Sequence, residues 1–287
     1  MKPPPFAYAA PGSLDEALEL LAAHGDEAKV LAGGQSLVPL LNMRLARPAV
    51  LVDVNRISEL AEWRVQNGTV SLGATVRQSA LTEPELAAHL PLAAACAPCI
   101  GHFVTRNRGT VGGSVAHADA RGELPLALLA LDGTAVAASK RAGTRSVGAD
   151  ELFVTHFTTS LAADELLVET RWPARRAGWR YAFEEFAQRH GDYALAMVAV
   201  ALRVDGGRVA EARIAVGGTA DRPLLLESVA ASVTGSGIDD ATATAAGEIA
   251  SSAVEPTDDL HASSVYRRRL VATLVARACL SAYASAA

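Results

Sequence analysis

Cysteine, lysine and long apolar runs are scarce in this 287-residue sequence, and each scarcity excludes a class of protein. Three cysteines are too few for the disulfide framework of a small secreted domain. Only three lysines occur and arginine carries nearly all the positive charge, while the net charge of −5 gives no electrostatic reason to expect binding to nucleic acid or to an anionic membrane. No apolar stretch reaches the roughly 20 residues that span a bilayer, and the first residues lack a hydrophobic signal core. We therefore expect a cytoplasmic protein without a transmembrane segment.

The cysteine count also limits the metal chemistry of the chain. Cys96-Ala97-Pro98-Cys99 has the spacing of a redox or metal pair, and only Cys279 remains beside it. A tetrahedral zinc site or a two-iron cluster needs four ligands. We therefore expect no metal site on this chain and interpret Cys96 and Cys99 as buried thiols in a helical segment. A redox-active disulfide between them is the alternative.

Two double-glycine motifs are the most informative features that the sequence does contain. They are Ala32-Gly33-Gly34-Gln35-Ser36 and Thr110-Val111-Gly112-Gly113-Ser114, and we interpret both as turns that follow short apolar or β-branched runs. Glycine lets successive amides point into one concavity with no Cβ in the way, and such nests bind phosphate. Two nests predict a ligand with two phosphates, a dinucleotide. The Rossmann fingerprint, the P-loop and the Gly-x-Ser-x-Gly elbow are all absent.

Hydrophobic periodicity and turn signals predict a mixture of helices and strands. Ser13 and Glu16 begin an amphipathic helix that Gly25 ends, and Asn67-Gly68 is typical of a hairpin. The segment 173–178, with proline, glycine and arginines, is the best candidate for a domain boundary. Further strands are expected at 29–32, 50–54, 136–137, 166–168, 196–204 and 209–216, and further helices at 83–100, 124–131, 241–252 and 266–283.

Three ordered segments carry a resemblance to a known family. Residues 29–39 and 106–119, which contain the two glycine motifs, resemble the two FAD signatures of the medium subunits of molybdenum hydroxylases. This family includes carbon monoxide dehydrogenase, N-heterocycle dehydrogenases and xanthine dehydrogenase. Residues 189–196, Arg-His-Gly-Asp-Tyr-Ala-Leu-Ala, resemble a third segment of those subunits. The resemblance covers essentially the whole chain.

The resemblance implies an α+β fold with two domains. Residues 1–175 would form an FAD-binding domain of the vanillyl-alcohol-oxidase/PCMH type, with subdomains of about 1–57 and 58–175. Residues 176–287 would form a smaller α+β domain of the carbon monoxide dehydrogenase flavoprotein type.

The resemblance also implies a non-covalent FAD site and no catalytic acid–base residue on this chain. Asp119 would bind the ribose side of FAD, Lys29 would line the site, Leu167 would pack near the cofactor, and Tyr193 would stand beside the isoalloxazine ring. Some relatives carry a lysine where this chain has Glu184 and Glu185, so the flavin contacts there are left open. The pyrophosphate would be held by Ala32, Gly33, Gly34, Gln35, Ser36, Thr110, Val111, Gly112, Gly113 and Ser114.

The function implied is that of an electron-transferring subunit in a dimer of heterotrimers. A large subunit would oxidise the substrate at a molybdenum cofactor, and a small subunit with 2Fe-2S clusters would pass electrons to FAD on this chain. Gln35, where some carbon monoxide enzymes have histidine, favours an organic substrate such as an N-heterocycle over carbon monoxide. The alternatives are a stand-alone FAD-dependent oxidase or dehydrogenase, and a nucleotide-binding module without redox chemistry.

Overall fold

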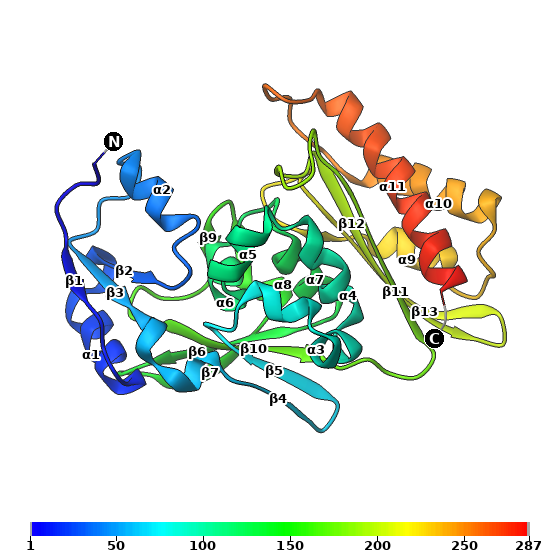
Figure 1. Cartoon of the computed structure of the whole chain (residues 1–287). Coiled ribbons are helices and arrows are strands. Elements are labelled where there is room, and N and C mark those ends of the chain that lie inside the picture. Colours follow the sequence, from blue (N-terminus) through cyan, green and yellow to red (C-terminus); the bar gives the residue numbers. More distant parts are fainter. Residues whose placement is uncertain (1, 286–287) are drawn as a thin grey trace.

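The computed structural model describes residues 2–285, and Figure 1 shows how the chain passes through its successive sheets. A three-stranded sheet comes first, a five-stranded sheet forms the middle of the molecule, and a four-stranded sheet belongs to the C-terminal part. A short two-stranded hairpin completes the set in the described residues. No helix within residues 2–285 is long and apolar enough to cross a membrane.

The first sheet is parallel and leads into the first glycine motif. Its strands are β1 (Ala7–Ala9), β3 (Val50–Asp53) and β2 (Ala28–Leu31), in that order across the sheet. Helix α1 (Leu14–His24) joins β1 to β2, and the predicted ends are confirmed: the Ser13 hydroxyl caps its start and Gly25, at φ 49°, ends it. The motif then connects the end of β2 to helix α2 (Leu37–Asn42).

The second sheet is antiparallel and runs in the order β4-β5-β10-β6-β7. The predicted hairpin between β4 and β5 is confirmed, because Asn67 and Gly68 have φ of 50° and 73°, as a type I′ turn requires. The strands are β4 (Trp63–Gln66), β5 (Thr69–Gly73), β6 (Thr134–Ser139), β7 (Gly143–Gly148) and β10 (Leu166–Pro173).

Short helices surround this sheet, and the helix expected over residues 83–100 is in fact divided. Pro91 lacks an amide hydrogen and disfavours helical angles at Leu90, which has φ −126° and ψ 61°. The helices are α3 (Pro84–His89), α4 (Pro91–Cys96), α5 (Phe103–Arg108), α6 (Val111–His117), α7 (Glu123–Ala130) and α8 (Ala149–Leu152), and the small hairpin is β8 (Phe153–Thr155) with β9 (Thr158–Thr159). Short 3-10 turns occupy Gly25–Glu27, Val54–Arg56, Ser58–Ala61, Gln78–Thr82 and Ala97–Cys99.

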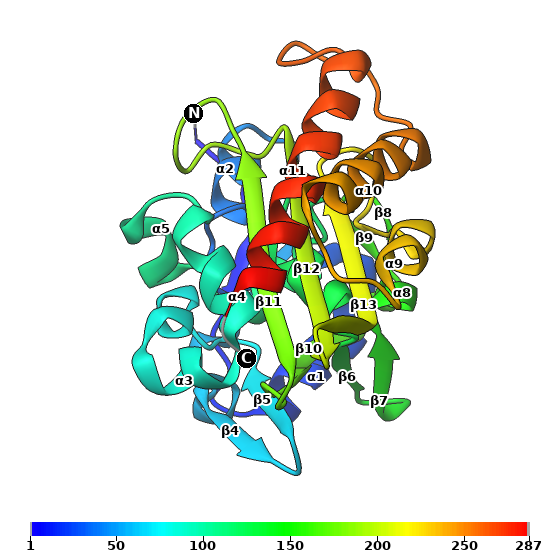
Figure 2. The same cartoon turned by 90° about the vertical axis from the view of Figure 1, so that its right-hand side faces the viewer.

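The C-terminal part is an antiparallel sheet covered by helices on one face. Figure 2 shows α11 lying over the long strands β11 and β12, with α10 beside it. Gly206 and Gly207, both with positive φ, form the predicted turn between β12 and β13. The elements are β11 (Trp179–Phe186), β12 (Ala196–Asp205), β13 (Arg208–Gly217), β14 (Leu224–Leu225), α9 (Glu227–Val233), α10 (Asp240–Ala253) and α11 (Ser264–Ala284).

Strand β12 is buried on both faces, so the two parts of the molecule share a core. Val198 and Val200 belong to the hydrophobic cluster that contains residues of α10 and α11. The alternate residues Met197 and Ala199 belong to the cluster built around α4 and α7. The sequence of a strand that is buried on both faces is a continuous run of apolar residues, as it is at residues 196–202. The C-terminal sheet is therefore packed between its own helices and the N-terminal part.

Candidate functional site

The first glycine motif forms a loop with unpaired backbone donors. Gly34 has φ 72°, a conformation that glycine adopts without strain. Within residues 2–285, the amides of Gly33, Gly34, Gln35 and Ser36 donate to no protein acceptor. Buried or half-buried amides normally have partners, so four successive free donors are available to an anion. Gly33, Gly34 and Gln35, but not Ser36, line a cleft of about 400 Å³, together with Leu31, Ala32, Val38, Pro39, Asp53, Asn55 and Arg108.

The second glycine motif is the start of helix α6, and the expectation of a second turn was wrong. Thr110 is the N-cap, and its Oγ1 accepts a hydrogen bond of 3.0 Å from the Gly113 amide. The Gly112 amide donates to the Ala74 carbonyl at 3.1 Å, and the Ser114 amide donates to the Thr110 carbonyl at 3.1 Å. A threonine N-cap followed by residues with helical angles favours a helix over a nest. The amides of Val111, Gly112, Gly113 and Ser114 are therefore bonded within the protein.

The fold brings the two motifs into contact. A Cβ built on Gly33 would lie 2.5 Å from the Arg108 carbonyl oxygen and 2.7 Å from the Cα of Gly109. A Cβ built on Gly113 would lie 3.6 Å from the Cβ of Ala32. Only a residue without a side chain fits at position 33, because the segment before the second motif passes directly against it.

A bridge of polar side chains also joins the two motifs. The Asn55 Nδ2 donates to the Ala32 carbonyl at 2.8 Å, and its Oδ1 accepts from Arg77 Nη2 at 2.9 Å. Arg77 Nη1 in turn donates to the Arg108 carbonyl at 2.6 Å. Burial, and then the charge of Arg108, lower the pKa of Arg77. Asn55 and Arg77 thus connect the carbonyl of one motif to the segment that precedes the other.

Asp53 orients this bridge from the end of β3. Its Oδ1 accepts from the Asn55 amide at 2.9 Å and from Asn55 Nδ2 at 2.7 Å, while its Oδ2 accepts from the Tyr8 hydroxyl at 2.6 Å. Partial burial acts to raise the pKa of Asp53, but the hydrogen bonds from Tyr8 and Asn55 outweigh it and the pKa is lowered. The sequence analysis missed Asp53, Asn55 and Arg77. The signal was available for Asp53 and Asn55, since polar residues at the carboxyl end of a parallel strand lie where such sheets bind ligands.

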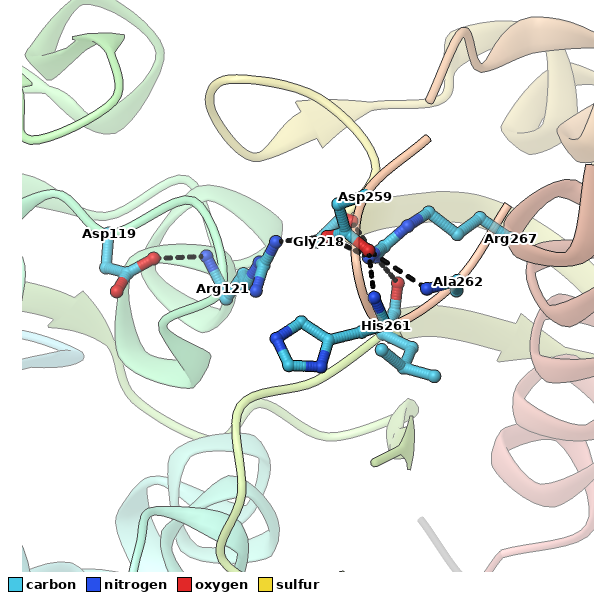
Figure 3. A network of polar contacts seen from close by, with 8 residues as sticks. Asp119, Arg121, Gly218, Asp259, His261, Ala262 and Arg267 are labelled. Carbon is cyan, nitrogen blue, oxygen red and sulfur yellow. Dashed lines mark hydrogen bonds and ion pairs between the residues drawn. The ribbon is translucent and has the colours of Figure 1, made fainter. Parts of the chain in front are cut away.

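Asp119 and Tyr193 lie at a second position, where the two parts of the molecule meet. Asp119 follows Ala118, a non-glycine residue with φ 52° that ends α6, and its Oδ1 accepts from the Arg121 amide at 2.9 Å (Figure 3). The Tyr193 side chain is 60% exposed. Desolvation of its hydroxyl, followed by the carboxylates of Asp119 and Glu123, raises the pKa of Tyr193. The two predicted residues are therefore neighbours, although they are far apart in the sequence.

Lys29 and Leu167 do not line the cleft in this structure. The Lys29 side chain is exposed on β2, and Leu167 is a residue of β10 that is 4% exposed and belongs to the hydrophobic core cluster around α4 and α7. Lys29 is on the strand that leads into the first glycine motif, whereas Leu167 is on a strand of the five-stranded sheet. Their roles in cofactor binding stay predictions.

Glu185, one of the two acids whose flavin contacts the sequence left open, is partly buried. Its Oε2 has no hydrogen-bond partner within residues 2–285. Burial, and then the neighbouring Glu123, raise the pKa of Glu185 to about 8, and burial raises the pKa of Glu123 to about 7. Each carboxyl therefore holds a proton to a higher pH than usual. Cys96 and Cys99 lie nearby as free thiols, and burial raises the pKa of Cys99 to about 11.

Comparison with known protein families matches both parts of the chain. Residues 4–175 match the model described as the FAD binding domain in molybdopterin dehydrogenase, and residues 181–282 match the CO dehydrogenase flavoprotein C-terminal domain. The predicted α+β fold, an FAD-binding domain followed by a flavoprotein C-terminal domain, is thereby confirmed.

Curated relatives and solved structures match along nearly the whole chain. The 6-hydroxypseudooxynicotine dehydrogenase complex subunit alpha of Paenarthrobacter nicotinovorans is 44% identical, over 96% of this chain and 94% of the relative. The nicotine 6-hydroxylase medium subunit of the same organism is 41% identical, over 98% and 99%. The carbon monoxide dehydrogenase structure from Hydrogenophaga pseudoflava is 38% identical with a TM-score of 0.96 and covers 100% of both chains. Quinoline 2-oxidoreductase from Pseudomonas putida 86 is 40% identical with a TM-score of 0.94, over 99% and 98%.

Proposed function

Because the chain belongs to the FAD-binding medium subunits of molybdenum-containing dehydrogenases, we propose that it holds FAD between an iron–sulfur partner and an external electron acceptor. The observation that carries this proposal is the set of four amides at residues 33–36 that donate to no acceptor within residues 2–285, in a loop that borders a cleft. A pyrophosphate needs several converging donors, and this loop supplies them.

The other predicted residues have defined places in this proposal. The Ser36 and Ser114 hydroxyls and the Ala32 segment would complete the pyrophosphate site, while Asp119 would accept hydrogen bonds from the ribose side. Lys29 and Leu167 would support the site from their strands. Thr110, Val111, Gly112 and Gly113 would form the wall behind it, since the amides of Val111, Gly112 and Gly113 are bonded within the protein.

FAD, when bound, supplies the ability to exchange electrons singly or in pairs. The chain binds and orients it, and the Tyr193 ring, exposed at the meeting of the two parts, would lie beside the isoalloxazine and limit the access of water and acceptors. Glu185 and Glu123 would hold protons near this position around neutral pH, because burial favours their neutral forms.

We propose that the partners are a large subunit with the molybdenum cofactor and a small subunit with 2Fe-2S clusters, in a cytoplasmic dimer of heterotrimers. The supporting facts are the medium-subunit and complex-subunit names of the relatives and the three cysteines of this chain, too few for such a cluster. Two relatives above 40% identity are named for nicotine or a nicotine derivative, which favours an N-heterocyclic or related organic substrate over carbon monoxide.

Purification of the tagged chain from its host tests this proposal. We expect a complex of three different chains whose visible spectrum combines flavin and iron–sulfur absorption and bleaches with the organic substrate under anaerobic conditions. A yellow chain that comes alone and oxidises an organic substrate would establish the stand-alone flavoenzyme instead. A bound nucleotide without any absorbance change under reductant would establish the non-redox module.

A further inference from the structure

An acidic side chain from the C-terminal part lies between two arginines that come from different parts of the molecule. Asp259 is in the loop between α10 and α11. Its Oδ2 accepts from Arg121 Nη2 at 2.9 Å and from Arg267 Nη2 at 2.6 Å (Figure 3). Arg121 follows α6 in the N-terminal part, whereas Arg267 is on α11. One carboxylate oxygen therefore joins the two parts.

The Asp259 carboxylate is held in a fixed orientation. Its other oxygen, Oδ1, accepts from the amides of His261 at 2.8 Å and Ala262 at 2.9 Å. Desolvation opposes ionisation, but these two amides and Arg267 outweigh it and hold the pKa of Asp259 well below its usual range. Charge-assisted hydrogen bonds of this kind are about twice as strong as neutral ones. The carboxylate is thus ionised and oriented by groups of the C-terminal part, independently of Arg121.

Arg267 carries the contact on to the segment of Tyr193. The Arg267 side chain is 2% exposed, and its Nη1 donates to the Leu195 carbonyl at 2.6 Å and to the Gly218 carbonyl at 3.0 Å. Leu195 lies two residues after Tyr193 in the chain. A buried guanidinium with fixed acceptors restricts the position of the backbone that supplies them.

The same cluster also reaches the segment of Asp119. The Gly218 amide donates to the Ala120 carbonyl at 2.9 Å, and Ala120 lies between Asp119 and Arg121. Figure 3 shows Asp119, Arg121 and Gly218 on one side of Asp259 and Arg267 on the other. Both segments that supply the candidate ribose and flavin residues are therefore tied to a single carboxylate.

We infer that Asp259 is a positioning residue of the cofactor site: with Arg121 and Arg267 it forms a latch that fixes the Tyr193 segment against the Asp119 segment. The inference rests on the proposed function, because FAD would lie between the two segments that the latch aligns. The latch itself is a property of the chain and is testable without the cofactor. Its weakest arm is the Arg121 contact, because the Arg121 side chain is 31% exposed and the Arg267 side chain is buried.

The decisive variant is Arg121→Gln, because it opens the latch between the two parts and leaves the Asp259–Arg267 pair intact. Asp259→Asn would leave the buried Arg267 without its counter-charge and is expected to destabilise the chain strongly, so it serves as the second variant. Arg203→Gln is the matched control, since it removes the Arg203–Glu211 ion pair of 2.7 Å on the C-terminal sheet, and within residues 2–285 neither side chain bonds to Asp259, Arg121 or Arg267.

The first readout is amide hydrogen exchange of the full chain without FAD. We expect Arg121→Gln to speed exchange in residues 187–195 and at Gly218 by about tenfold, with Arg121→Lys in between, and Arg203→Gln to leave both unchanged. Unchanged exchange in Arg121→Gln would overturn the latch. Equally faster exchange throughout the C-terminal sheet would overturn it too, because that result means general destabilisation.

The second readout is the rate at which reduced flavin is reoxidised in the assembled complex. If Arg121→Gln speeds local amide exchange and also alters the reoxidation rate, the results support both the latch and its role at the cofactor. Faster local exchange with an unchanged reoxidation rate supports the latch and contradicts the place of Tyr193 in the proposed function. The two failures are thereby distinguished.

Discussion

The two glycine motifs have similar sequences and different physical roles. In the first, Gly33-Gly34, the chain turns with a positive φ at Gly34 and leaves four amides free at a cleft. In the second, Gly112-Gly113, the chain begins a helix and its amides are bonded to carbonyls and to the Thr110 hydroxyl. The comparison teaches that a glycine pair can provide a nest or can permit close packing.

The reason for glycine in the second motif is the neighbouring strand. A Cβ built on Gly112 would lie 2.5 Å from the Cα of Ala74, which follows β5. Gly112 is buried and has no positive φ, so its missing side chain serves contact rather than conformation. At Gly33 the reason is also contact, with the Arg108 backbone, while the positive φ of the nest is at Gly34.

Gly33→Ala is expected to have the largest effect, because it acts on both motifs. The new Cβ overlaps the Arg108 carbonyl and the Gly109 Cα, so the loop must shift away from the segment before the second motif. Losing two charge-assisted hydrogen bonds would cost about 3 kcal/mol, or roughly a hundredfold in the Kd for FAD. Flavin fluorescence titration measures this. Gly12→Ala is the control, since its Cβ would meet only the Glu16 carboxylate at 3.8 Å.

Gly112→Ala sharpens the comparison by separating folding from binding. Overlap with the Ala74 backbone is expected to lower the free energy of unfolding by about 1–3 kcal/mol. The Kd for FAD of the folded fraction should change by less than about threefold, because the Gly112 amide is already bonded within the protein. Urea unfolding and FAD titration of the same sample test both statements. Large loss of FAD affinity at full stability would contradict the division of roles.

Arg77→Gln tests whether the two motifs must be held together. It removes the hydrogen bonds to the Arg108 carbonyl and to Asn55 Oδ1, and it leaves the Asn55 oxygen without its partner. We expect the Kd for FAD to rise by about tenfold, or about 1.4 kcal/mol. Arg56→Gln is the control on the neighbouring exposed turn. Equal affinities of the two variants would show that the bridge does not matter for binding.

Ser36→Ala and Ser114→Ala form a matched pair with the smallest expected effect. Each removes one hydroxyl, and a single neutral hydrogen bond is worth about 1 kcal/mol, so the Kd for FAD should rise by about fivefold in each. Ser114 is the more informative position, because the amides of its motif are occupied. If Ser114→Ala binds FAD as tightly as the unchanged chain, the second motif serves packing alone.

Local elements of the fold were predictable because their signals lie within a few residues. The Ser13 cap and Gly25 end of α1 and the Asn67-Gly68 turn are as the sequence predicts. The break at Pro91 was also signalled by the residue itself. The helical start at Thr110 was missed, because Thr-Val-Gly-Gly-Ser is compatible with a turn until the acceptors for its amides are known.

The motifs of this sequence and their order indicated by themselves which family the chain belongs to, and its three cysteines are one fewer than an all-cysteine 2Fe-2S cluster requires. Only the tertiary structure decided which glycine amides are free, because the acceptors at Ala74 and Val76 come from another segment. It also decided that Asn55 bridges to Arg77 and that Asp259 joins Arg121 to Arg267. Hydrogen-bond partners far apart in the chain are brought together by packing, and no local pattern specifies them.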